Sequence, residues 1–129
     1  MVLVTTPAPG AFLRGLEGEQ ELSISSITKA IELREDRITP VTLQPKDLDL
    51  PFERIEHLAP PGVDGEAELT TKILGNKVKG SQREWVVMNA AMILYTGGKA
   101  ASIRAALPLA QEALASGAAK KKLDEFLSR

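Results

Sequence analysis

Three glutamates at alternate positions are the residues of this chain whose type and spacing most suggest chemistry. Glu17, Glu19 and Glu21 lie in the segment GLEGEQELS, which runs from Gly15 to Ser23. In an extended chain, side chains at alternate positions point to the same side. Carboxylates gathered in this way could supply oxygen ligands to Mg²⁺, which usually takes one or two of them beside water and substrate phosphates. The pattern is also typical of an acidic turn between two strands, and by itself it favours that interpretation.

Two other motifs have ordinary structural interpretations. His57 follows Glu53 and Glu56, and a histidine beside carboxylates could act as a base. The chain has no serine turn of the kind that serves a catalytic triad, so we predict a solvated loop histidine. The segment TGGKA at 96–100 has the composition of a phosphate loop, but its glycines follow a helical pattern and its lysine precedes an alanine. It therefore predicts a helix end followed by a turn.

Basic residues form two small groups in the second half of the chain. Lys77, Lys79 and Arg83 surround a predicted helix start, where free backbone N–H groups attract anions. The run from Lys120 to Lys122 lies in a predicted helix near the end of the sequence. For both groups a solvated surface is the favoured interpretation, and contact with a phosphate or another anion is the alternative.

Composition narrows the function classes. A chain of 129 residues with 43% hydrophobic and 26% charged residues is typical of one soluble globular domain. A net charge of −1 and an aromatic content of 4% disfavour a nucleic-acid binder, which usually has a basic excess and stacking surfaces. The absence of cysteine excludes disulfides, thiolate metal sites and cysteine nucleophiles. No signal-peptide pattern or long apolar run occurs, so we expect a cytoplasmic protein without a membrane segment.

The first half of the chain has the pattern of strands. Residues 28–43 predict a hairpin, because alternating and β-branched residues flank a polar turn near Glu35 and Asp36. Pro40 places the second strand of this hairpin at a sheet edge, since proline cannot donate a ladder hydrogen bond. Residues 45–65 are rich in proline and predict a connector with only short helical turns.

The second half has the pattern of four helices. Asp64 is the predicted N-cap of the first, which ends at Gly75 and Asn76. Ser81 and Glu84 predict a capping box, and the helix that they open is apolar on almost every face, as in helices buried on all sides. Pro108 predicts a kink or a late start in the third helix. The last two helices have apolar stripes, formed by Ile103, Ala106, Leu107, Ala110 and Leu114 and by Leu123, Phe126 and Leu127.

These patterns together predict an α/β fold. A strand-rich N-terminal half with a hairpin at about 28–43 would form a sheet, and a C-terminal bundle of about four helices would pack on it. We expect a single domain over residues 1–129, with residues 1–10 as a flexible or non-family lead.

Several segments resemble the C-terminal end of the anthranilate phosphoribosyltransferase family, which shares its fold with the pyrimidine nucleoside phosphorylases. The run NAAMILYTGGKAASIRAALPLAQEALASGAAKKKLDEF at 89–126 is similar to the family's terminal helices. KAIELREDRITPVTLQPKDLDL at 29–50 resembles its strand–turn–strand and the corner that follows, and DGEAELTTKILGN at 64–76 resembles its next helix. RGLEGEQELS at 14–23 lies where the family has a histidine-glycine, a short loop and an aspartate-glutamate pair. The resemblance covers about residues 11 to 127.

The resemblance implies a magnesium-assisted transferase of tryptophan biosynthesis. The family's enzymes join anthranilate to phosphoribosyl pyrophosphate (PRPP) and release pyrophosphate, and the aspartate-glutamate pair holds Mg²⁺ on the diphosphate. Arg14 and Gly15 fall at the family's histidine and glycine, which makes them candidate substrate-binding residues. Gln20 falls at the aspartate and Glu21 at the glutamate, so Glu21 is the expected metal ligand, with Glu19 as a substitute for the charge that Gln20 lacks.

The family's glycine-rich diphosphate loop, its lysine-histidine-glycine-asparagine segment and its anthranilate contacts do not occur in these 129 residues. We therefore expect a fragment or a partner-dependent subunit that is inactive alone and binds PRPP only when completed. The completing partner would be a second polypeptide or another copy in a homo-oligomer. The alternative is a non-catalytic binding module or a remnant of the fold, with weak nucleic-acid binding that the net charge of −1 disfavours.

Overall fold

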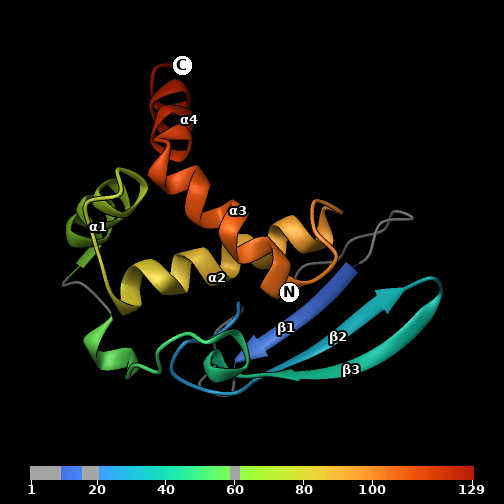
Figure 1. Ribbon diagram of the computed structural model, residues 1–129. Helices are drawn as coiled ribbons and strands as arrows, with labels where there is room; N and C mark the ends of the chain where they lie inside the picture. The colour runs from blue at the N-terminus through green and yellow to red at the C-terminus, as the bar shows by residue number, and fades with distance from the viewer. Residues whose placement is uncertain (1–9, 16–20, 59–61) are drawn as a thin grey trace.

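The computed structural model describes residues 10–15, 21–58 and 62–129, which form a small antiparallel sheet covered by helices (Figure 1). The predicted lead at residues 1–10 lies outside the described residues except for Gly10, where the first strand begins. Strands β1 (Gly10–Gly15), β2 (Thr28–Arg34) and β3 (Arg37–Leu43) pair in the order β1-β2-β3. The predicted α/β fold, with a strand-rich first half and four helices after it, is confirmed.

The hairpin predicted at 28–43 is present as β2 and β3. Its register pairs Thr28 with Leu43 and Arg34 with Arg37, which leaves a two-residue turn. Both turn residues, Glu35 and Asp36, have positive φ angles of 50° and 61°. This is the backbone of a type I′ turn, whose twist matches that of the flanking strands.

The two faces of β2 differ as the alternating pattern requires. Thr28 and Ala30 are buried against the helices, whereas Lys29 and Ile31 on the other face are exposed. The pairing places β3, which contains Pro40, at one edge of the described sheet. The edge position predicted from this proline is therefore confirmed.

The connector after β3 contains two short 3-10 helices, η1 (Pro45–Leu48) and η2 (Ile55–His57). Both fall within the segment for which only short helical turns were expected. Leu48 and Leu58 are buried in the core, and the Glu53 N–H donates to the Ile24 carbonyl at 3.1 Å. The connector is thus held against the irregular segment at 22–27, which contains Ile24.

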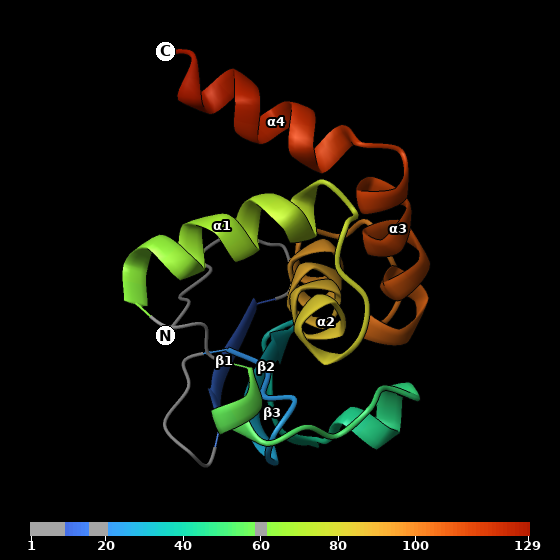
Figure 2. The same cartoon turned by 90° about the vertical axis from the view of Figure 1, so that its left-hand side faces the viewer.

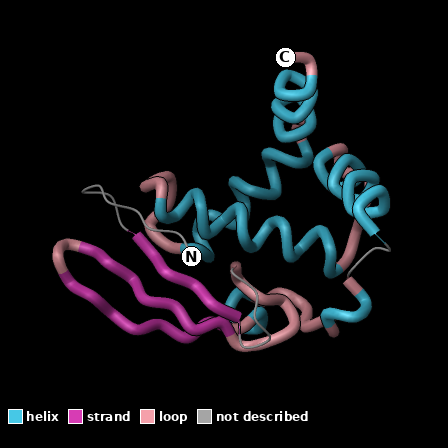
Figure 3. Tube along the Cα trace, turned by 180° about the vertical axis from the view of Figure 1, so that it is seen from behind, coloured by secondary structure: helices cyan, strands magenta, loops and turns pink. Residues whose placement is uncertain are grey.

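Four α-helices follow: α1 (Gly62–Leu74), α2 (Ser81–Thr96), α3 (Ile103–Ala115) and α4 (Ala118–Leu127). Figure 2 shows α2 nearly end-on at the centre of the molecule, between the sheet and the other helices. The view from behind in Figure 3 shows the hairpin extending past the helices on one side and α4 pointing away from the sheet. None of the described helices has the length and apolar character that a membrane crossing requires.

Two helix ends follow the glycine and asparagine signals closely. At the end of α2, the Lys99 N–H donates to the Leu94 carbonyl and Gly98, with φ 71°, donates to the Tyr95 carbonyl. These are the two bonds of a Schellman motif with glycine in the left-handed position. Asn76, with φ 55°, ends α1 in the same way. The segment at 96–100 is therefore a helix end and turn, as predicted.

Two predicted helix starts are wrong. Asp64 lies inside the first turn of α1, because the helix already includes Gly62 and Val63. The capping box at Ser81 is also absent: Gly80 is the N-cap. The Glu84 carboxylate pairs with Arg83 at 2.7 Å instead of reaching back to the N-cap.

Of the two alternatives predicted for Pro108, a kink or a late start, the late start does not occur. α3 begins five residues earlier at Ile103, and the Ser102 hydroxyl caps it by accepting from the Ala105 N–H at 3.1 Å. Pro108 therefore lies within α3, where its missing N–H leaves the Arg104 carbonyl without an intrahelical donor.

The core lies where α2 and α3 meet the irregular segment at 22–27, which precedes β2. Leu22 and Ile24 pack in one cluster with Val87 and Ala91 of α2 and with the predicted stripe of α3. The prediction that α2 is buried on all sides is only partly right, because Ile93 is 70% exposed. On α4 the predicted apolar face is largely uncovered, with Phe126 and Leu127 both exposed.

Candidate functional site

Glu21 is the one predicted metal ligand that the described residues include. It is exposed and begins an irregular segment that leads to β2. Glu19 and Gln20 lie outside the described residues. Arg14 and Gly15 end β1, where their backbones pair with Lys29 and Thr28. Both predicted substrate positions therefore lie immediately before residues 16–20 in the sequence, and Glu21 follows immediately after them.

Leu22, the residue after Glu21, is fixed to α2 by three hydrogen bonds. Its N–H donates to Asn89 Oδ1 at 2.8 Å, and its carbonyl accepts from Asn89 Nδ2 at 3.0 Å and from Trp85 Nε1 at 2.7 Å. The Leu22 side chain is also almost fully buried, at 1% exposure. Because both the N–H and the carbonyl of Leu22 are bonded to side chains of one helix, α2 fixes the backbone next to Glu21.

A buried hydroxyl network holds the rest of this segment. The Ser23 N–H donates to Thr28 Oγ1 at 2.9 Å, and the Ser25 N–H donates to Ser23 Oγ at 3.2 Å. The Ser23 and Ser25 hydroxyls lie 3.0 Å apart and share a hydrogen bond. These residues satisfy the backbone of a non-regular segment inside the core, where unpaired polar groups would be costly.

Glu21 faces an open groove of about 400 Å³ between the connector, α1 and α2. The apolar part of the groove includes Ile73 and Leu58, and its polar part includes Glu66 and Asn89. The groove is thus lined both by the exposed Glu21 carboxylate and by the Asn89 side-chain amide, which binds the backbone of Leu22. It could accept a polar ligand at the Glu21 end.

Of the metal ligands that the resemblance implies, the described residues include a single carboxylate, that of Glu21. In the portion of the chain that is described, no group of three or more histidine, cysteine, aspartate or glutamate side chains could hold a metal ion. Mg²⁺ on a diphosphate needs only one or two protein carboxylates, since water and phosphate oxygens fill the remaining positions. The exposed carboxylate of Glu21 is of the chemical type that could supply one such oxygen.

His57 behaves as a solvated histidine, as predicted. Its side chain is 63% exposed, and its Nδ1 lies 2.8 Å from Glu53 Oε1. The hydrogen bond from His57 lowers the pKa of Glu53, and a second bond from the Arg54 N–H acts in the same direction. Because this pair is exposed, it contributes little to stability.

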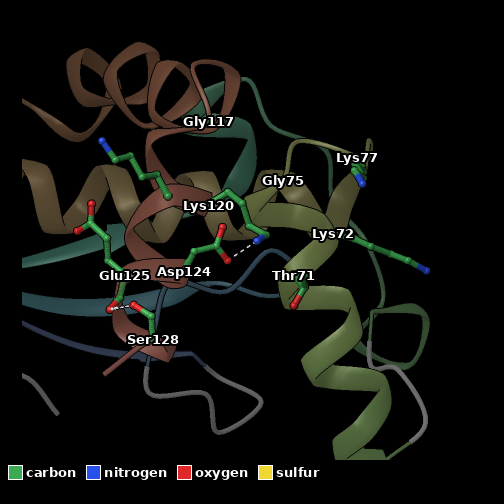
Figure 4. Close-up of a pocket in the computed structure, with 10 residues that line it drawn as sticks. Thr71, Lys72, Gly75, Lys77, Gly117, Lys120, Asp124, Glu125 and Ser128 are labelled. Carbon is green, nitrogen blue, oxygen red and sulfur yellow. Dashed lines mark hydrogen bonds and ion pairs between the residues drawn. The ribbon is translucent and has the colours of Figure 1, made fainter.

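The two basic groups of the sequence partly meet in a cleft between α1 and α4 (Figure 4). Lys77, Lys120 and Lys121 line it together with Lys72. Figure 4 shows Lys120 turned toward Asp124, with which it forms an ion pair, and Lys72 extending away from α4. Lys72 pairs with Glu68 at 2.6 Å, which lowers the pKa of that carboxyl. Two of these four amines, those of Lys72 and Lys120, are thus already paired with carboxylates, which favours the solvated surface over an anion site.

One polar pair was missed by the sequence analysis. The Tyr95 hydroxyl, near the end of α2, donates to the Glu32 carboxylate on the inner face of β2. Burial raises the pKa of Tyr95, and the hydrogen bond to Glu32 acts in the same direction. The alternation of β2 could have revealed this position, because Glu32 shares its face with the buried Thr28 and Ala30.

Comparison with known proteins identifies the relatives of this fold. The family model described as "Glycosyl transferase family, a/b domain" matches residues 2–120. The anthranilate phosphoribosyltransferase of Methanobrevibacter smithii is 39% identical over 113 residues, which are 88% of this chain and 33% of that protein. The enzyme of the same name from Nitrosomonas eutropha is 37% identical over 111 residues, with 86% and 32% covered. The chain thus spans about a third of the length of these relatives.

Solved structures agree with this assignment. The anthranilate phosphoribosyltransferase of Thermus thermophilus superimposes with a TM-score of 0.78 at 27% identity, covering 93% of this chain and 35% of that one. The Saccharomyces cerevisiae enzyme in complex with PRPP and Mg has a TM-score of 0.80 at 20% identity, with 92% and 34% covered. At that identity the yeast structure shows a shared fold only. From the match over residues 2–120, this chain belongs to the glycosyl transferase family, a/b domain.

Proposed function

We propose that this chain forms the C-terminal part of a phosphoribosyltransferase that transfers the phosphoribosyl group of PRPP to anthranilate and releases pyrophosphate. The observation that carries the proposal is the 39% identity to an anthranilate phosphoribosyltransferase over 88% of the chain. Because the chain spans about a third of its relatives, the reaction would belong to the completed fold. The remaining two-thirds would supply the diphosphate loop and the anthranilate contacts, as a preceding segment or as a second polypeptide.

The contribution of these residues would be to position the diphosphate. Glu21 would provide one carboxylate oxygen to Mg²⁺, and the ion, when bound, would neutralise charge on the diphosphate. The three hydrogen bonds that fix Leu22 to α2 hold the neighbouring Glu21 in place before substrate arrives. Such preorganisation matters because phosphoribosyl transfer depends on positioning and on charges placed in advance.

Gln20 makes the proposed site weaker than the family's pattern. It stands where the family has an aspartate, so the pair that faces the ion carries one negative charge fewer. Glu19 is the nearest carboxylate that could replace this charge. Two substitutions test whether Glu19 replaces the charge that Gln20 lacks. Gln20→Asp should tighten Mg²⁺-dependent binding of PRPP. Glu19→Gln should weaken this binding only if Glu19 contributes its charge to the site.

A chimera provides the test of binding. The corresponding third of the Methanobrevibacter smithii enzyme is replaced by this chain, and PRPP is titrated calorimetrically with and without Mg²⁺. We expect Mg²⁺-dependent heat and a loss of affinity of at least about tenfold in Glu21→Gln. Mutation of a residue that only supports a metal ligand already costs about tenfold in affinity, and loss of the ligand itself should cost at least as much. Glu66→Gln, in the same groove but on α1, is the matched control and should leave the affinity unchanged.

Two results would contradict the proposal. A folded chimera that gives no heat with PRPP and Mg²⁺ would remove PRPP binding from the function of this chain. Equal affinities for the unaltered chimera and the Glu21→Gln variant would retain PRPP binding but remove Glu21 from the metal site.

A further inference from the structure

A cavity of about 270 Å³ lies between the hairpin and the corner where α2 meets α3. Its walls come from five separate elements, β2, β3, η1, α2 and α3, so it forms only when the whole fold is assembled. It shares no lining residue with the groove at Glu21, which lies along the first half of α2. The inference concerns this separate cavity and does not rest on the proposed function.

The interior of this cavity is apolar. Ala30, Leu48 and Met92 line it and are each less than 10% exposed, at 7%, 6% and 6%. Val41 and Ile103 complete the apolar wall and are half-buried. A small concave space with apolar walls and a few polar groups is the usual form of a small-molecule site.

The charged groups at the rim are not equally available to a ligand. Arg104 is committed to the connector, because its guanidinium pairs with the Asp49 carboxylate and donates to the Asp47 carbonyl. Glu32 accepts a single hydrogen bond from the Tyr95 hydroxyl in the described part of the chain. A carboxylate has room for about four hydrogen bonds, so Glu32 retains capacity for a donor.

The location of Glu32 strengthens its electrostatic effect. Its side chain is half-buried on the inner face of β2, beside the buried Ala30. Arg34, two residues along the strand, is exposed and lines a different cavity with Lys99. It also acts on the Tyr95 hydroxyl, where it opposes the increase in the pKa of Tyr95, so it offsets part of the negative charge of Glu32. The cavity thus combines an apolar interior with one partly desolvated negative charge, an arrangement that favours a cation over an anion or a neutral molecule.

We propose that this cavity binds a small primary amine with an apolar body, whose ammonium group donates to the Glu32 carboxylate while the body packs against Ala30, Leu48 and Met92. Tyr95 holds the carboxylate in position through its own hydroxyl. The volume of about 270 Å³ suits a body no larger than a small aromatic molecule.

The test uses three probes of the same body and different charge: benzylamine, benzyl alcohol and benzoate. Methyl signals of Met92, Leu48 and Ile103 are followed by NMR during titration of the full chain. We expect saturable shifts of these methyls, with benzylamine binding about three- to fivefold more tightly than the other two, the upper part of the range for a partly exposed ion pair. Absence of saturable shifts, or a preference for benzoate, would overturn the proposal.

Two variants locate the charge and the cavity. Glu32→Gln should reduce the preference for benzylamine over benzyl alcohol to less than about twofold, whereas Glu35→Gln, on the exposed turn, should preserve it. Ala30→Leu should fill the cavity and abolish the shifts for all three probes. A preference that survives in a folded Glu32→Gln variant would contradict the assignment to Glu32. Should that variant not fold, the ranking of the three probes on the unaltered chain decides the matter.

Discussion

At the scale of single residues, Asn89 anchors the segment that follows Glu21. This side chain uses both ends of its amide on one residue: Oδ1 accepts from the Leu22 N–H and Nδ2 donates to the Leu22 carbonyl. An irregular segment inside a core cannot satisfy its own backbone, so a side chain on a rigid helix does so instead. The same contact places the carboxylate of Glu21 beside α2.

Replacing Asn89 by alanine should destabilise the fold. The Leu22 N–H would lose its acceptor within the core, which costs about 1–3 kcal/mol of unfolding free energy. Urea denaturation followed by Trp85 fluorescence measures this, because Trp85 is the only tryptophan of the chain. Gln111→Ala, on the exposed face of α3, is the control and should change the unfolding free energy by less than about 0.5 kcal/mol. An equally small change for Asn89→Ala would contradict the anchoring role.

Tyr95 makes the fold sensitive to alkaline pH. Its pKa is raised by burial and by the bond to Glu32, so the folded state favours the neutral phenol. The unfolded chain loses this proton near pH 10 and the folded chain at a higher pH. The contribution of Tyr95 to stability is therefore complete below about pH 10 and is lost as the pH rises through the folded-state pKa.

The single tyrosine of the sequence permits a direct measurement. Ultraviolet absorbance of the phenolate should titrate above the ordinary tyrosine value in the folded protein. In Glu32→Gln the midpoint should fall toward that value, because a neutral amide no longer favours the protonated phenol. In Glu35→Gln it should remain raised. A midpoint at the ordinary value in the unaltered protein would exclude the Tyr95–Glu32 contact.

At the scale of secondary-structure elements, α2 organises the molecule. It carries Trp85 and Asn89 for the segment after Glu21, and its buried side contributes Val87, Met88, Ala91 and Met92 to the core. Its surface is not uniform, since Val87 is fully buried while its neighbour Val86 is 37% exposed. Comparing substitutions at Val86 and Val87 therefore tests which side of α2 packs against the core.

Val87→Ala should lower the unfolding free energy by about 2 kcal/mol, because two buried methyl groups are lost and a small cavity remains. Val86→Ala, the matched control, should cost less than about 1 kcal/mol, since much of that side chain already contacts water. Thermal or urea denaturation measures both. Equal losses would mean that α2 is covered on both sides in solution.

The elements that could be predicted from the sequence are those fixed by nearby residues. The hairpin at 28–43 follows from local alternation around Glu35 and Asp36, and the Schellman ends follow from Gly98 and Asn76. The start of α2 could not be predicted in the same way. Ser81 and Glu84 have the spacing of a capping box, but Glu84 instead pairs with Arg83. Two local interactions of similar strength compete there, and the sequence does not indicate which one forms.

The candidate site was only partly accessible from the sequence. The position of Glu21 came from the family resemblance, whereas its anchoring depends on Asn89 and Trp85, more than sixty residues away along the chain. The contact between Tyr95 and Glu32 spans a similar separation. Contacts of this range arise from the packing of α2 on the sheet, which a linear pattern does not specify.

At the scale of the whole molecule, large apolar side chains remain uncovered on the side of the sheet opposite the helices. Ile31, Leu33 and Ile38 are 47%, 39% and 73% exposed, and the register places Leu33 directly opposite Ile38. Contiguous exposed apolar surface is typical of an interface. We therefore propose that this face of the hairpin contacts a second copy of the chain.

Sedimentation velocity tests this face. We expect the average sedimentation coefficient of the purified chain to rise with concentration. The double substitution Leu33→Lys and Ile38→Lys should suppress the rise, because charges would have to be desolvated in the contact. Val63→Lys, at an isolated exposed position on α1, is the control and should leave the association unchanged. A monomer at all concentrations, or equal suppression by both variants, would remove the hairpin as the interface.

The proposed function is that these residues complete a phosphoribosyltransferase. The most direct measurement is the rate of anthranilate consumption, followed by its fluorescence, in the chimera that replaces the matching third of the Methanobrevibacter smithii enzyme by this chain. We predict Mg²⁺- and PRPP-dependent turnover that falls at least about tenfold in Glu21→Gln and rises in Gln20→Asp. A folded chimera that consumes no anthranilate, with or without Gln20→Asp, would contradict the claim.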